Sequence, residues 1–118
     1  MKIRLKENSL RYRLTRSEVD QFASTGVYKE KVTIGEESLV YILQRTAEPD
    51  LRATLDTNLI TLLVPEKLAD EWTGTEQVGF ETHDGPLHIL VEKDFTCLEN
   101  VAEDQSDNYP NPLLDKRK

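Results

Sequence analysis

Apolar and basic residues alternate along the first 14 residues of the chain. The apolar positions are Ile3, Leu5, Leu10, Tyr12 and Leu14. The basic positions are Lys2, Arg4, Lys6, Arg11 and Arg13. A period of two puts the apolar side chains on one face of a strand and the charged ones on the other. The segment is predicted to form two strands joined by a turn at Asn8-Ser9, with Arg4 opposite Arg13 and Lys6 opposite Arg11.

Two short segments have the signals of helix ends. Thr15 and Glu18 have the spacing of a capping box, and Gly26 suits the left-handed position after a helix. In the second half, Pro65 stands where a helix begins and Gly74 where it ends. The apolar stripes are Val19, Phe22 and Ala23 in the first helix and Leu68, Ala69 and Trp72 in the second.

Four further strands are predicted over residues 28–34, 39–46, 77–83 and 87–95. Asp84-Gly85 is typical of the type I′ turn of a tight hairpin. That turn puts Glu81 opposite His88 on the polar face, with His83 beside them. The residues expected to be buried on the other face are Val78, Phe80, Ile89 and Val91.

The order of these signals repeats along the chain. Residues 3–35 align with residues 53–85, and residues 39–45 align with residues 87–93. The alignment pairs Phe22 with Trp72 and Gly35 with Gly85. The repeat therefore predicts two ββαββ units that superpose about an approximate twofold axis.

The fold class is predicted to be α+β: duplicated ββαββ units, mainly antiparallel, in an eight-stranded barrel-like sheet with two short helices. Closure into a barrel is expected because it removes sheet edges. A twisted open sheet with both helices on one face is the alternative. Residues 1–95 are taken as one domain with halves 1–46 and 51–95, and residues 96–118 as an acidic, irregular C-terminal tail.

Composition narrows the function classes. The chain has 118 residues, a formal net charge of −7 and one cysteine. The acidic balance argues against nucleic acid as a partner. No apolar run approaches the length of a membrane span, and the N-terminal segment lacks the apolar stretch of a signal peptide. A cytoplasmic protein is expected, as a monomer or a homodimer, with a small anion or a protein as its partner.

The basic start of an acidic protein needs a separate explanation. Like charges opposite each other on a strand pair are destabilising, and the second half has no such charges at the equivalent positions. Three explanations stay open: solvent alone, the acidic tail with Glu103, Asp104 and Asp107, or a bound phosphate-like anion. The anion-binding candidates are Arg4, Lys6, Arg11 and Arg13.

Other candidate sites have weaker patterns. Glu81, His83 and His88 are candidate ligands of a divalent metal, because two imidazoles and a carboxylate can form an open metal site. A solvated polar face is the competing interpretation, and no cofactor is predicted. Cys97 is expected to be a small buried residue. Tyr109, Leu113 and Leu114 are expected to dock the tail on the domain.

The two ends of the chain resemble those of a small bacterial protein family of unknown function. The segments that carry the resemblance are "KIRLKENSLRYRLTRSEV" and "ILVEKDFTCLENVAEDQSDNYPNP". The resemblance implies that the tail belongs to the domain, but it implies no chemistry.

A more distant resemblance concerns the order of elements. Counted from "SLRYRLT", the chain reads strand, helix and three strands, twice, which is similar to the plan of the triphosphate tunnel (CYTH-like) phosphatases. That resemblance implies a barrel with basic residues inside. The E-x-E-x-K signature of those enzymes is absent, so no metal-ligating carboxylate is carried over.

The sequence thus favours a noncatalytic binding or interaction domain with an unspecified ligand. The alternative is a phosphate-compound binder or phosphohydrolase of the triphosphate-tunnel type that uses the N-terminal basic hairpin. The two differ in whether Arg4 and Arg13 face an enclosed space with carboxylates opposite.

Overall fold

The computed structural model of the protein describes residues 1–95 and residue 109. This part of the chain contains eight strands and two short helices, in agreement with the predicted α+β class. The elements are β1 (Lys2–Lys6), β2 (Ser9–Leu14), α1 (Arg16–Thr25), β3 (Val27–Ile34), β4 (Glu37–Thr46), β5 (Arg52–Asp56), β6 (Leu59–Pro65), α2 (Glu66–Gly74), β7 (Gly79–Asp84) and β8 (Leu87–Lys93).

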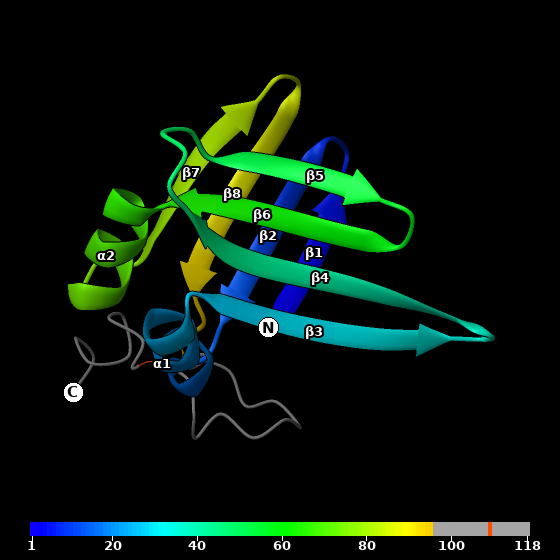
Figure 1. Cartoon of the computed structure of the whole chain (residues 1–118), viewed down its shortest axis with the longest axis horizontal. Coiled ribbons are helices and arrows are strands. Elements are labelled where there is room, and N and C mark those ends of the chain that lie inside the picture. The colour runs from blue at the N-terminus through cyan, green and yellow to red at the C-terminus, as the bar shows by residue number, and fades with distance from the viewer. Residues whose placement is uncertain (96–108, 110–118) are drawn as a thin grey trace, which may run out of the picture.

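The strands form two four-stranded sheets, so the prediction of a closed eight-stranded barrel is wrong. Sheet A has the order β1-β2-β8-β7, and sheet B has the order β3-β4-β6-β5. In Figure 1 sheet B lies in front of sheet A, and the strands of the two sheets cross. The apolar face of each sheet covers that of the other, so the core is buried without closing the edges.

Each sheet combines one hairpin from each half of the chain. The four hairpin pairings are antiparallel, whereas β2 pairs with β8 and β4 pairs with β6 in parallel. Ser9 lies opposite His88 where the first parallel pair begins, and Leu59 lies opposite Val40 in the second. The predicted alignment of the halves matches Ser9 with Leu59 and Val40 with His88. It therefore converts the first of these pairs into the second. The superposition of the two ββαββ units itself stays a prediction.

The β1–β2 turn lies one residue earlier than the sequence suggested. Its two loop residues are Glu7 and Asn8, and Glu7 takes a positive φ of 54°. Arg4 consequently lies opposite Arg11, and Lys2 opposite Arg13. The predicted pairing differs by two residues, and such a shift leaves every side chain on the same face, so alternation could not distinguish the two registers.

Strand β8 explains this register. The backbone carbonyl of Asn8 accepts a hydrogen bond of 3.0 Å from the N–H of His88, and its side-chain amide donates to the carbonyl of Pro86 at 2.8 Å. Ser9 is thereby drawn into the parallel ladder, where it lies opposite His88. The turn position is set by a strand some 80 residues further along the chain, which no local pattern reveals.

The β7–β8 turn also differs from the prediction. Its loop residues are Gly85, with φ 60°, and Pro86, so Asp84 pairs with Leu87. A type I′ turn needs a positive φ at both loop residues, whereas proline fixes φ near −65°. His83 therefore lies opposite His88, and Glu81 lies opposite Leu90.

Both predicted helix starts are confirmed. Thr15 is the N-cap of α1, its backbone N–H donates to Glu18 Oε1 at 2.8 Å, and Gly26 ends the helix with φ 83°. Pro65 is the N-cap of α2. The helices lie side by side at one end of the two sheets (Figure 1), where the rings of Phe22 and Trp72 approach to 6.2 Å between centroids.

The core lies between the two sheets and extends under the helices. Its largest fully buried side chains are Trp72, Tyr12, Phe22, Leu14, Leu43, Leu62, Ile89, Val19, Val64 and Val91. Of the four residues expected to be buried in β7 and β8, Ile89 and Val91 are buried and Phe80 is partly buried, but Val78 is 44% exposed. Val78 lies just before β7, which begins at Gly79.

Candidate functional site

The predicted basic residues gather on the outer face of sheet A. Alternation in β1 and β2 sends Leu10, Tyr12 and Leu14 into the core, so the arginines and lysines point to the other side of the sheet. Arg11 is half-buried on this face, while Arg4 and Lys6 are exposed. The space between the sheets is apolar, so the cations do not line an internal tunnel.

A shallow hollow of about 300 Å³ lies over this basic surface. Its lining residues are Lys2, Ile3, Arg4, Arg11 and Arg13. Four of these five residues are cations, and we call the hollow that they line the basic hollow. Three of the four anion-binding candidates thus come together, whereas Lys6 lies outside the lining, and Lys2 is an additional member that the sequence analysis did not select.

Two carboxylates partly neutralise the basic hollow. Glu92 Oε1 lies 2.7 Å from Arg11 Nε and 4.0 Å from Arg13 Nε, and Asp94 Oδ2 lies 3.0 Å from Lys2 Nζ. Among the residues that the structure describes, Arg4 forms no ion pair. Since Arg4 also faces Arg11 across the ladder, positive charge remains in excess at this point.

No local pattern in the sequence predicts the contact between Glu92 and Arg11. That contact exists because β2 and β8 are parallel neighbours, with Arg13 opposite Glu92. Parallel pairing between strands at opposite ends of a chain leaves no local signal in the sequence, since it needs a long connection through other elements.

The candidate metal residues lie at the turn end of the same face. His88 Nε2 lies 2.7 Å from Glu81 Oε2. The rings of His83 and His88 are stacked, with centroids 4.6 Å apart and an angle of 13° between planes. The lone pairs of imidazole lie in the ring plane, so the stacked rings do not direct them to one point. Within residues 1–95 and 109, no group of three potential ligands is placed to hold a metal ion.

A second polar cluster surrounds the backbone ammonium of Met1. The ammonium lies 2.5 Å from Glu18 Oε2 and 2.5 Å from Glu30 Oε1. The hydroxyl of Tyr28 donates to Glu18 Oε2 at 3.2 Å, and that of Tyr41 donates to the carbonyl of Met1 at 2.8 Å. The sequence predicted only the capping role of Glu18.

The electrostatics of this cluster centre on Glu18. Burial by itself raises the pKa of the carboxyl, but hydrogen bonds from the Met1 ammonium and the Thr15 N–H outweigh it, and the pKa lies below its ordinary value. Burial, with the adjacent carboxylate of Glu18, raises the pKa of Tyr28. The cluster joins β1, α1 and β3, which indicates a structural role.

Tyr109 is the one residue of the predicted tail beyond residue 95 whose placement the structure describes. Its backbone N–H donates to the carbonyl of Asp94 at 2.8 Å, and its ring packs edge-on against Phe95. Arg16 and Lys93 place their cations 5.5 and 5.4 Å from the ring centroid. Cys97, Leu113, Leu114 and the acids Glu103, Asp104 and Asp107 lie outside the described residues.

We predict that Tyr109→Ala lowers the free energy of unfolding by about 1 to 2 kcal/mol, because one aromatic pair and two cation–π contacts are lost. Urea titration followed by circular dichroism measures this change. Tyr109→Phe keeps the ring and these contacts and should lose less stability than Tyr109→Ala. Equal midpoints for Tyr109→Ala and the parent would show that these contacts contribute no stability.

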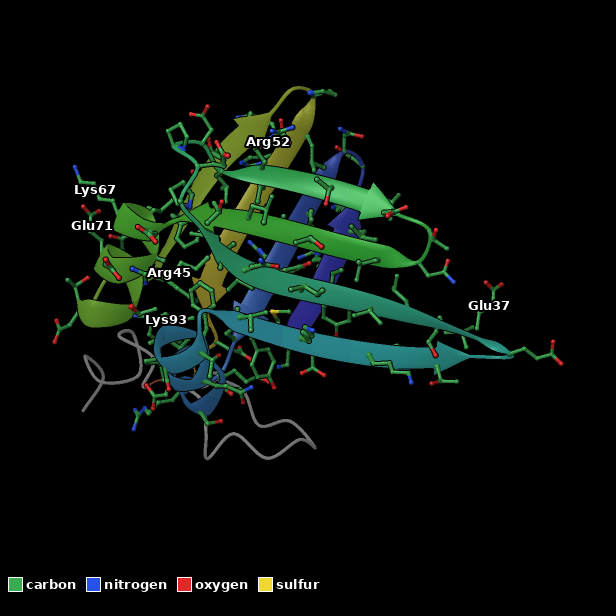
Figure 2. The ribbon with its side chains drawn as sticks, in the orientation of Figure 1. Glu37, Arg45, Arg52, Lys67, Glu71 and Lys93 are labelled. Atoms are coloured by element: carbon green, nitrogen blue, oxygen red, sulfur yellow. The ribbon has the colours of Figure 1, made fainter. Side chains whose placement is uncertain are left out.

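Two further cations, Arg45 and Lys93, lie close to α2. Figure 2 shows Arg45 of β4 beside this helix, where its Nη1 lies 2.7 Å from Asp70 Oδ1. Lys93 of β8 is buried and donates to the carbonyl of Thr75 at 2.8 Å. Burial lowers the pKa of Lys93, although nearby Glu76 opposes the shift. Both cations have partners among the described residues, whereas Arg4 has no ion pair there.

Fold and site define an α+β protein of two crossed four-stranded sheets with a basic hollow on one outer face. The chain belongs to the family described as a family of unknown function (DUF7009), which matches residues 1–113. No curated protein and no solved structure matches the chain. No helix of the described residues is long and apolar enough to cross a membrane.

Proposed function

We propose that this protein is a noncatalytic binding domain that holds a phosphate-like anion in the basic hollow. The observation that carries the proposal is the position of Arg4, which faces Arg11 across the ladder and forms no ion pair with any residue that the structure describes. Guanidinium groups bind phosphate oxygens with two parallel hydrogen bonds. A bound anion relieves the repulsion between Arg4 and Arg11.

The triphosphate-tunnel alternative has less support. An enzyme of that type encloses its cations within a barrel, whereas the basic residues here lie on an outer face and two separate sheets enclose apolar side chains. An open hollow excludes little water, and water weakens the electrostatic stabilisation that phosphoryl transfer needs. Binding without turnover is the better fit to this geometry.

Phosphate binding by matched variants tests the proposal. We expect inorganic phosphate and pyrophosphate to shift the backbone amide resonances of β1 and β2. Arg4→Gln should weaken binding about tenfold, since one charge-assisted contact is lost. Arg52→Gln is the control, because Arg52 lies on β5 in sheet B, away from the hollow (Figure 2).

Two results would contradict the proposal. Equal phosphate affinity of Arg4→Gln and Arg52→Gln would place binding elsewhere. Release of phosphate from pyrophosphate in the presence of Mg²⁺, lost in Arg4→Gln but kept in Arg52→Gln, would favour the enzyme instead.

A further inference from the structure

The outermost strand of sheet A, β7, leaves part of its backbone open. Among the strands that the structure describes, β7 pairs with β8 alone. The N–H of Lys93 donates to the carbonyl of Val78 at 2.9 Å, so the residues of even number from Val78 onward bond to β8. Hydrogen-bonded pairs alternate along an antiparallel ladder. The N–H and C=O groups of Glu81 and His83 therefore point away from β8, toward the open edge of the sheet.

Side-chain hydrogen bonds lie at both ends of β7. The side-chain amide of Gln77 donates to the carbonyl of Gly79 at 3.0 Å, and Asp84 Oδ2 accepts a bond of 3.0 Å from the N–H of Ala53. Between these two contacts, the backbone groups of Glu81 and His83 have no hydrogen-bond partner within the described ranges. Open ladder groups of this kind pair readily with another extended chain.

A groove of about 470 Å³ runs beside this open edge. It lies between β7, the helix α2 and the segment 49–51, and its volume is within the range of ordinary ligand sites. Leu51, Leu68 and Phe80 provide apolar lining. In Figure 2 Lys67 and Glu71 mark the α2 side of the groove.

We propose that an extended peptide binds in this groove as an additional strand of sheet A, antiparallel to β7. Strand addition uses backbone hydrogen bonds for affinity and alternate side chains for specificity. Each peptide residue opposite Glu81 or His83 exchanges two backbone hydrogen bonds with it. The groove therefore recognises an extended backbone together with a pattern of period two.

The lining defines the chemistry of that peptide. Side chains on the Phe80 side meet Leu51 and Leu68, so apolar residues fit there. Side chains on the other face lie beside Glu81, and the groove holds the carboxylates Asp50, Glu71 and Glu81 against the single cation Lys67. The peptide is thus one that alternates apolar and basic residues. A folded second copy fits less well, because α2 lines the groove together with β7 and so limits the space for a second folded domain.

The test uses three synthetic peptides and the full-length protein. The parent probe is Ac-Leu-Lys-Val-Lys-Leu-NH2, whose lysines lie opposite Glu81 and His83. We expect it to shift the amide resonances of β7 and to protect those of Glu81 and His83 from hydrogen exchange. N-methylation of both lysines should weaken binding at least about tenfold, since the N–H groups that bond to β7 are removed.

Matched controls separate backbone pairing from charge. N-methylation of the central valine alters an N–H that points away from β7, so affinity should change by less than about threefold. Glu81→Gln should weaken the parent peptide by about threefold, whereas Glu36→Gln, in the distant β3–β4 turn, should not. Equal affinity for all three peptides, or association of the free protein that protects the same amides, would overturn the proposal.

The inference is independent of the basic hollow. Arg4→Gln is expected to leave peptide affinity unchanged, and Glu81→Gln is expected to leave phosphate affinity unchanged. Loss of one kind of binding without the other would therefore show which of the two proposals is wrong.

Discussion

Replacement of Trp72 by alanine should lower the free energy of unfolding by about 3 to 5 kcal/mol. Trp72 of α2 is fully buried, and its ring packs against α1 and β7. Its ring contacts Phe22 at 6.2 Å and Phe80 at 5.5 Å between centroids, and its indole N–H donates to the carbonyl of Val78 at 3.1 Å. Alanine leaves a cavity that rigid neighbours on three elements fill only in part.

Urea titration followed by far-ultraviolet circular dichroism is the appropriate measurement, since the variant loses the protein's one tryptophan as a fluorescence probe. Leu55→Ala is the control: Leu55 is 72% exposed, so its removal should change stability by less than about 0.5 kcal/mol. Similar midpoints for the two variants would mean that the α1–α2 end is not part of the cooperative core.

Substitution of Glu18 by glutamine is the second large effect that we expect. The carboxylate accepts hydrogen bonds from the Thr15 N–H, the Met1 ammonium and the Tyr28 hydroxyl, with its side chain only 16% exposed. Glutamine removes the charge and replaces one acceptor by a donor. We therefore expect the free energy of unfolding to fall by about 2 to 3 kcal/mol, because hydrogen bonds to a charged group at a partly buried site are lost.

The pH dependence provides a separate test of the same residue. The folded pKa of Glu18 lies below its ordinary value of 4.5, so the unfolded state binds the proton more readily. The stability due to this group is complete above pH 4.5 and is lost as pH falls through the folded pKa. Glu18→Gln should therefore show a shallower loss of stability in acid than the parent protein.

Glu30→Gln is the matched control for Glu18→Gln. Glu30 also contacts the Met1 ammonium and Tyr28, but it caps no helix and its side chain is 31% exposed. Glu30→Gln should lower the free energy of unfolding by less than half as much as Glu18→Gln does. An equal cost for the two variants would show that the capping contact of Glu18 to Thr15 contributes little.

The sequence located most elements because their signals are local. The alternation through Tyr12 placed β1 and β2, and Thr15 with Glu18 marked the start of α1. Apolar pattern and caps act within a few residues, so they can be read from a short window. The same alternation assigned Arg4, Arg11 and Arg13 to one polar face, which the structure brings together in the basic hollow.

Register and sheet assembly did not follow from local signals. The pairs Arg4–Arg11 and His83–His88 differ from the predicted pairs because a two-residue shift keeps each side chain on its face. The prediction of a barrel was wrong for a related reason. Alternation identifies the buried face of a strand but does not show which element covers that face. The contacts of Glu92 with Arg11 and of Met1 with Glu18 depend on this assembly.

The sequence by itself determined the class of the fold, the helix boundaries and the polarity of each strand face, because these depend on periodicity and capping within one element. Only the tertiary structure decided which strands pair, where the turns fall and how the edge of β7 meets α2. Those features arise from parallel pairing between distant hairpins and from the packing of two sheets. Many pairings bury the same apolar faces, and long-range contacts select among them.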